Sequence, residues 1–124
     1  KLLNLLVFIR DYMNSKSNSN LDRLSQQFLV HSYLYYQLNE SIIGDEKYDQ
    51  LCVSLKKEAE GQNDYLYQEL IEPALGNEGS GFAIPTKAYP PRIISTALHL
   101  LYQDQYKDKV SLNNFLKSYG YRTK

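Results

Sequence analysis

Apolar side chains recur along this chain at intervals of three and four residues, which is the period of an amphipathic α-helix. Read with its breaks at Gly, Pro and polar runs, the pattern predicts helices over residues 1–14, 20–40, 45–60, 65–71, 92–106 and 111–120. No segment alternates between apolar and polar residues for the length of a strand. The sequence therefore predicts an all-α domain of about five to six helices, without an internal repeat.

The second expected helix is rich in aromatic residues. Its apolar stripe consists of Leu24, Phe28, His31, Tyr35 and Leu38. Tyr33 and Tyr36 add bulk outside that stripe, and Asn20 or Ser19 stands where the helix could be capped. A helix that is aromatic around so much of its circumference is either buried against several neighbours or lines a ligand site.

The third expected helix follows a short connection at residues 41–44, and Asp45 stands at its start as a candidate N-cap. Gly61 is a plausible stop signal for it. The apolar positions of this helix have the i, i+3, i+4, i+7 spacing of a single buried face, and they are Tyr48, Leu51, Cys52, Leu55 and Ala59.

Residues 72–91 contain all four prolines and three of the six glycines of the chain, so we expect a long loop there. A short helix over 65–71 should end before Pro73. Long loops in compact domains are often functional, although a surface excursion is the commoner outcome. Helical spacing returns from Arg92, and Ser111 can cap a last helix.

The length of 124 residues suits one domain, 1–124, and 43% hydrophobic and 23% charged residues indicate neither disorder nor a membrane span. Cys52 is the only cysteine, which excludes an internal disulfide framework and suits a reducing compartment, so we expect a cytoplasmic protein. Residues 1–9 are only faintly like a signal peptide, because no small-residue cleavage site follows. Because the sequence starts at Lys1 rather than Met, we expect that the true start of the protein lies before it.

The net charge is zero, but the charges are unevenly distributed. Residues 39–78 carry three basic and ten acidic side chains, and residues 87–124 carry seven basic and two acidic ones. Strong non-specific DNA binding needs clustered Lys and Arg, and the zero total argues against it. The 92–124 helices are basic enough to meet a phosphate group, although a solvated surface of mixed charge is the simpler interpretation.

The stretch from His31 to Glu60 reads HSYLYYQLNESIIGDEKYDQLCVSLKKEAE. It resembles domain Ia of bacterial NAD-dependent DNA ligases, a small helical domain in which a helix with Tyr followed by Tyr or His precedes Asp-x-x-Tyr-Asp-x-Leu. The matching positions here are Tyr35, Tyr36, Asp45, Tyr48, Asp49 and Leu51. Residues 20–60 would form the ligase-Ia-like helix-loop-helix, and the chain would be similar to small ligase-related proteins of phages and Gram-positive bacteria.

The resemblance implies a binding site for nicotinamide mononucleotide, the leaving half of NAD during ligase adenylation. By that analogy Tyr35, Tyr36 and Tyr48 would contact the nicotinamide and ribose, and Asp45 and Asp49 would accept hydrogen bonds from its polar groups. It also links the chain to DNA replication and repair. Ligase activity is not expected, because the Lys-x-Asp-Gly adenylation motif and the modules of a ligase core are missing.

The residue types agree with such a ligand independently. Asp45, Tyr48 and Asp49 stand at i, i+3 and i+4 and so share one helical face. The nicotinamide ring of NAD is a pyridinium cation, which aromatic faces attract and which carboxylates attract further. Phosphate contacts would have to come from elsewhere, and the candidates are Lys87 and Arg92.

Simpler roles stand beside these. Asp45 could be only an N-cap, and Tyr48 could belong to the core. His31 and His99 are more simply half-buried structural histidines than metal ligands, since no second His or Cys stands at metal spacing, and we expect no metal. The Gly79-Ser80-Gly81 turn could cradle a phosphate, but no helix N-terminus follows it directly, and a flexible loop is the simpler interpretation.

Three functions remain open from the sequence. The first is a stand-alone module that binds nicotinamide mononucleotide, NAD or a derivative. The second is a protein-interaction module, associated with a host or viral replication protein, that kept the scaffold but lost the ligand. The third is an NAD-cleaving enzyme assisted by Asp45 or Asp49, for which no second catalytic group is recognisable.

Overall fold

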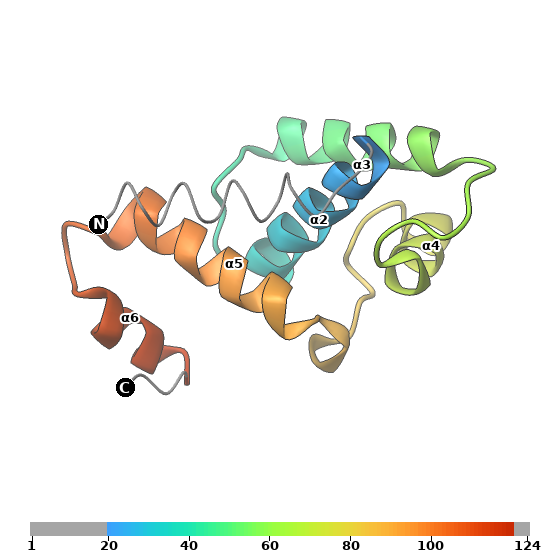
Figure 1. The fold of residues 1–124 in the computed structure, drawn as a ribbon. Helices are drawn as coiled ribbons and strands as arrows, with labels where there is room; N and C mark the ends of the chain where they lie inside the picture. Colours follow the sequence, from blue (N-terminus) through green and yellow to red (C-terminus); the bar gives the residue numbers. More distant parts are fainter. Residues whose placement is uncertain (1–19, 121–124) are drawn as a thin grey trace.

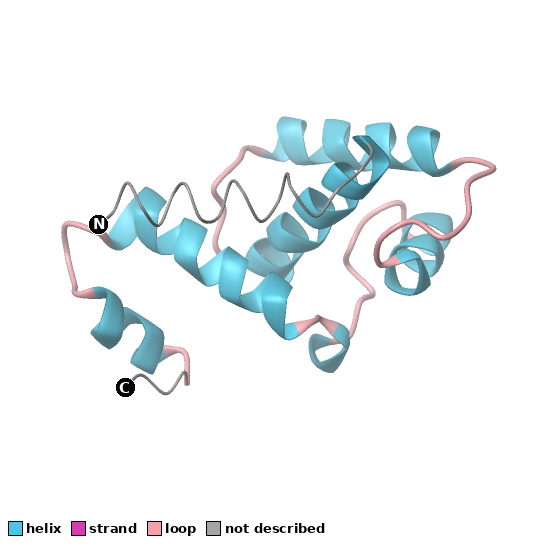
Figure 2. Cartoon of the chain, viewed as in Figure 1, coloured by secondary structure: helices cyan, strands magenta, loops and turns pink. Residues whose placement is uncertain are grey.

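A computed structural model describes residues 20–120 of the chain, and within that range every regular element is helical (Figures 1 and 2). The α-helices are α2 (Asn20–Ser32), α3 (Asp45–Ala59), α4 (Gln68–Asn77), α5 (Pro91–Leu101) and α6 (Leu112–Ser118). The all-α prediction is confirmed for this part of the chain. The helix expected over 1–14 and the candidate cap Ser19 lie outside the described residues.

Helix α2 is the central element of the fold. It packs against α3, α4 and α5, which surround it in Figure 1. Phe28, Leu29 and Leu34 on and just beyond it are fully buried. Burial on several sides agrees with the large side chains that α2 and the π-helical segment after it carry on more than one side.

The single stripe expected on this helix is only partly correct. Phe28 is buried, but Leu24 and His31 are half-buried and Tyr35 is 40% exposed. Ser25, Val30 and Ser32 are buried instead, together with Leu29 and Leu34. The reason is that three neighbouring helices cover different sides of α2, so burial does not follow one line of residues.

Two π-helical segments extend α2 and α5. The first spans Tyr33–Gln37 and the second spans Tyr102–Tyr106. In the first, the N–H of Leu38 donates to the carbonyl of Tyr33, five residues earlier, at 3.3 Å. The helix expected over 20–40 is therefore helical to Gln37, but its last turn is wider than an α-helical turn.

Helix α3 begins with Asp45 as its first helical residue, and Gly44 occupies the N-cap position. The interpretation of Asp45 as an N-cap is therefore wrong, because its backbone is already helical and no side-chain cap is formed. The predicted buried face is confirmed at Tyr48, Cys52 and Leu55. Gly61 follows the helix with a φ of 73°, as a stop signal requires.

Helix α4 contradicts the prediction that the chain is a loop from residue 72. It runs from Gln68 to Asn77 with Pro73 in its interior. Ile71, Ala74 and Leu75 are buried on both sides of the proline, and their burial offsets the hydrogen bond that Pro73 cannot make. The irregular segment is thus shorter, residues 78–90, with one 3₁₀ turn at Thr86–Ala88.

The C-terminal part follows the prediction more closely. Helix α5 starts at Pro91, which suits the first turn because its missing N–H has no helical partner there. The N-cap of α6 is Ser111, whose Oγ accepts a hydrogen bond from the N–H of Asn114 at 3.2 Å. Phe115 of α6 packs on the rings of Tyr102 and Tyr106, which ties α6 to the second π-helical segment.

Candidate functional site

The five residues singled out by the sequence line one cleft. Tyr35 and Tyr36 come from the first π-helical segment, and Asp45, Tyr48 and Asp49 come from the first two turns of α3. The cleft has a volume of about 190 Å³ and is open to solvent on one side. The short 38–44 connection and the packing of α2 on α3 bring the two halves of the motif together.

The three tyrosine rings form a contiguous cluster. The centroid of the Tyr35 ring lies 4.8 Å from that of Tyr36 and 5.8 Å from that of Tyr48. The Tyr36 and Tyr48 rings are 6.2 Å apart. Tyr35 and Tyr36 are adjacent in sequence and both rings contact Tyr48. The wide turn that holds them is of a kind that often occurs at functional sites.

Tyr48 is the buried member of the cluster, with 6% of its surface exposed. Its hydroxyl lies 2.7 Å from Oγ of Ser32 and accepts a hydrogen bond from the N–H of Gly81 at 3.0 Å. Burial raises the pKa of this phenol far above its usual value, so Tyr48 remains protonated. Because its hydroxyl is occupied inside the protein, Tyr48 offers the cleft its ring rather than a hydrogen bond.

Asp45 and Asp49 lie one turn apart on α3 and are both exposed to solvent. Neither carboxylate forms an ion pair or a hydrogen bond with another residue of the range 20–120. Their carboxylates thus keep their acceptor capacity for a ligand in the cleft. Asp45 also lies in the first turn of α3, where a negative charge is favourable.

A turn from the segment 79–82 packs beneath the cluster, and sequence reasoning did not assign it to the site. Gly81 is buried and donates to Tyr48, while Ser80 accepts a long hydrogen bond of 3.4 Å from the hydroxyl of Tyr36. Phe82 is 65% exposed, and its ring meets that of Tyr36 edge to face with centroids 5.7 Å apart.

This arrangement bears on the phosphate interpretation of the Gly79-Ser80-Gly81 turn. The Gly81 amide that could have met a phosphate is bonded to the hydroxyl of Tyr48. A Cβ on Gly81 would lie 2.5 Å from Cβ of Ser32 and closer still to its Oγ. The close approach to Ser32 explains the glycine. No local sequence pattern points to it, because the partners of Gly81 are distant in the chain, and even Tyr48 is 33 positions away.

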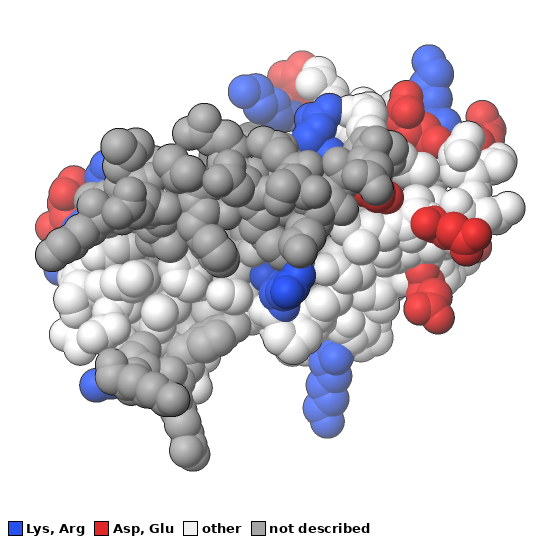
Figure 3. Space-filling model, in the orientation of Figure 1, with Lys and Arg blue, Asp and Glu red and all other residues white. Residues whose placement is uncertain are grey.

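Lys87 and Arg92 are exposed, and neither is among the residues that line the cleft. Their expected role as phosphate contacts therefore stays a prediction. Figure 3 shows Lys and Arg dispersed over one face of the molecule, while acidic groups on that face gather mainly where the C-terminal half of α3 and α4 lie.

Both histidines are half-buried, as expected. Nδ1 of His99 lies 2.7 Å from the carbonyl of Ser95 and donates to it. His31 lines a small recess beside the cleft together with Tyr35, Asp45 and Tyr48. Burial lowers the pKa of His31, which favours its neutral form at pH 7.

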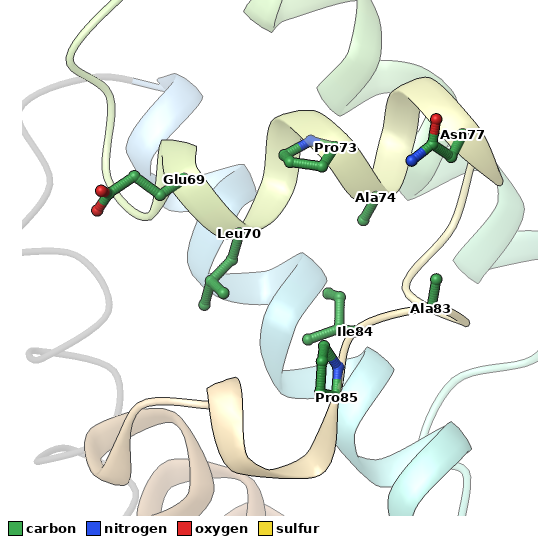
Figure 4. Close-up of a pocket in the computed structure, with 8 residues that line it drawn as sticks. All are labelled: Glu69, Leu70, Pro73, Ala74, Asn77, Ala83, Ile84 and Pro85. Atoms are coloured by element: carbon green, nitrogen blue, oxygen red, sulfur yellow. The ribbon is translucent and has the colours of Figure 1, made fainter.

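Two other hollows have different linings: one is mainly apolar, and a wider one also holds Gln103, Asp104 and Lys107. The one in Figure 4 holds about 220 Å³ where Leu70, Pro73 and Ala74 of α4 face Ile84 and Pro85. The side chains that line it are also those through which the segment 83–85 packs on α4. A wider groove of about 480 Å³ runs between α2, the 38–44 connection and the end of α5, and Ile42, Ile43 and Leu100 form its apolar part.

No cluster of three His, Cys, Asp or Glu side chains suited to a metal ion occurs between residues 20 and 120. In the same range, no helix has the length and apolar character needed to cross a membrane.

No protein-family model, no curated protein and no solved structure matches this chain.

Proposed function

We propose that this chain is a stand-alone module that binds the nicotinamide end of nicotinamide mononucleotide, NAD or a derivative, without ligase activity. The observation that carries the proposal is the cleft itself, because two segments of the sequence motif meet there and supply three aromatic rings and two carboxylates. A pyridinium ring is a flat cation, and both kinds of side chain attract it.

The size of the cleft supports recognition of one end of the dinucleotide. Sites that enclose drug-sized ligands usually measure about 300–1,000 Å³. A cleft of about 190 Å³ suits a nicotinamide ring and part of its ribose, and leaves a phosphate outside. Lys87 and Arg92 remain the proposed phosphate contacts.

A protein-interaction module is the second candidate, and the exposed aromatic side chains favour it. Tyr35 is 40% exposed and Phe82 is 65% exposed, and both rings contact Tyr36. Exposed aromatic clusters are typical of binding surfaces for other proteins as well as for small ligands. The two candidates differ in whether the isolated chain binds a nicotinamide nucleotide.

Calorimetric titration of the purified protein with nicotinamide mononucleotide and with NAD tests the proposal. We expect saturable heat in the wild type and at least a tenfold weaker affinity, about 1.4 kcal/mol, in Asp49→Ala. The matched control is Glu46→Ala, which removes the same charge from the same helix at an exposed position outside the cleft.

An absence of heat with both ligands at millimolar concentration would reject the nucleotide site and favour the interaction module. Equal losses in Asp49→Ala and Glu46→Ala would show that the net charge of α3, rather than the cleft, controls binding. Far-ultraviolet circular dichroism of each variant establishes that the helices are retained.

A further inference from the structure

We infer that residues 1–14 of this chain dock as an amphipathic helix in the groove between α2, the 38–44 connection and the end of α5. The inference is independent of the proposed function, because none of the five residues that line the cleft lines this groove. It concerns an interaction within the chain, between the described residues and the segment that precedes them.

The apolar side chains of the groove are only half-buried. Ile42 and Ile43 come from the connection and Leu100 comes from α5, and the groove that they border has a volume of about 480 Å³. Apolar side chains that share one hollow gain free energy when a further apolar surface excludes water from them. The groove therefore suits an apolar occupant.

One face of α2 leads from this groove toward the start of the helix. Gln27 and His31 line the groove, and Leu24 lies one turn before Gln27 on the same face. All three side chains are half-buried, although the sequence pattern placed Leu24 and His31 on an apolar stripe. An element packed along this face would complete the burial of that stripe, and the chain enters α2 from the same end.

The segment before α2 has the pattern and the length for this position. Its apolar residues recur at helical spacing, at Leu2, Leu5, Leu6, Ile9, Tyr12 and Met13. A helix of 14 residues is roughly 21 Å long, and the distance along α2 from Asn20 to His31 is roughly 16 Å. Residues 15–19 are an ordinary length for a connection between neighbouring helices, so the segment can return along α2 and reach the groove.

The helix expected over residues 1–14 also needs a surface to pack on. Isolated helices of this length are marginal in water, and most of their stability in proteins comes from the packing of an apolar face. The groove and the adjoining face of α2 supply such a surface next to the point where the segment joins the described chain.

Gln103 provides a polar argument for an occupant. It lines the groove with 8% of its surface exposed, and its Nε2 is buried without a hydrogen-bond acceptor among residues 20–120. Buried amide donors are almost always paired, because an unpaired one loses its bond to water without replacement. An oxygen atom of the docked segment would supply the acceptor.

Photo-crosslinking in the full chain tests the inference. p-Benzoylphenylalanine replaces Lys107, an exposed residue at the edge of the groove, and, as the matched control, Lys57, an exposed lysine of α3 outside it. Dilute protein is irradiated and digested with trypsin. Mass spectrometry should then detect an adduct of position 107 with peptide 2–10 or 11–16 of the same chain, and no such adduct of position 57.

Two variants assign the adduct to the apolar stripe. Leu6→Asp puts a charge in the stripe, whereas Val7→Asp puts the same charge about 100° further around the helix. Leu6→Asp should lower the yield of the adduct by about tenfold or more, since burial of one leucine side chain contributes at least that factor to docking. Val7→Asp should retain the adduct.

Three results would overturn the inference. They are the absence of an adduct at position 107, an equal yield from position 57, and an equal effect of Leu6→Asp and Val7→Asp. An adduct between two chains, with a yield that rises with protein concentration, would also overturn it and would assign the groove to a second copy.

Discussion

At the scale of single residues, the cleft depends on how Tyr48 is held. Its ring lies in the aromatic cluster, and its hydroxyl lies between Ser32 on α2 and the Gly81 amide. One side chain thus joins α2, α3 and the 79–82 turn. The pKa of Tyr48 is raised by burial, so these hydrogen bonds persist through the neutral and moderately alkaline range.

Gly81→Ala should destabilise the protein by about 1–3 kcal/mol, because the new methyl group overlaps Ser32 and the interior has no room for it. It should also weaken the nucleotide affinity, since Tyr48 loses its backbone donor when the turn shifts. Urea denaturation followed by circular dichroism measures the first effect, and calorimetry measures the second.

The matched control is Gly76→Ala. This glycine lies in α4, and a Cβ on it meets nothing within 4 Å, so alanine should be neutral or stabilise by up to about 1 kcal/mol through its higher helix propensity. Gly81→Ala with wild-type stability would mean that the close contact with Ser32 relaxes without cost.

At the scale of elements, two departures from regular α-helix shape the site and its surroundings. The π-helical turn at Tyr33–Gln37 ends α2 with Tyr35 and Tyr36 both against Tyr48. The second π-helical segment reaches the connection before α3, where the hydroxyl of Tyr106 donates to the carboxylate of Glu40 at 3.0 Å and the amide of Gln105 donates to the carbonyl of Ser41 at 2.9 Å.

Pro73→Ala tests the helix that the sequence placed in a loop. Because α4 continues through residue 73, alanine there supplies the backbone N–H that proline lacks. Alanine also increases the entropy of the unfolded chain, which offsets part of this effect. We expect the free energy of unfolding to rise by about 1–2 kcal/mol. The free energy of unfolding in urea measures it.

Pro85→Ala provides the comparison, because Pro85 has an extended backbone with a φ of −65° and lies outside any helix. There alanine should lower the free energy of unfolding by at least about 0.4–1 kcal/mol, since it adds unfolded-state entropy and also removes part of the apolar contact with α4. A similar decrease in the free energy of unfolding in both variants would show that residue 73 is not in a stable helix.

At the scale of the whole molecule, the site lies on the contact between α2 and α3, so binding and opening of the fold are coupled. Cys52 lies in that contact with 5% of its surface exposed, and burial raises the pKa of its thiol. Its reaction with a thiol reagent therefore requires the protein to open.

Cys52 should react with a thiol reagent at least ~100-fold more slowly in the native protein than in urea, because the thiolate is the reactive form and the thiol is buried. Nicotinamide mononucleotide at about 100 times its Kd should slow the reaction a further ~100-fold if opening separates the walls of the cleft. The rate is followed by absorbance of the released reporter group.

The control places the only thiol one position further along α3, as Val53→Cys in a Cys52→Ala background. Val53 is 68% exposed, so that thiol should react quickly with or without ligand. A wild-type protein that reacts as fast as this control would contradict the burial of Cys52.

The sequence by itself determined the features that short-range periodicity records. Helical spacing identified the all-α class and the buried face of α3, and Ser111 as the cap of α6. It also placed Tyr35, Tyr36 and the acidic face of α3 close enough along the chain to meet across one short connection. These features depend on neighbours within a few residues or one turn of chain, so a local pattern suffices to predict them.

Tertiary packing alone decided the rest of the site. The burial of Ser25, Val30 and Ser32 on α2, and the helix through Pro73, follow from which neighbouring elements cover each side. The contact of Gly81 with Tyr48 joins residues 33 positions apart. The free energy of such contacts comes from close packing between distant segments, and no periodicity in the sequence encodes which distant segment will fill a given space.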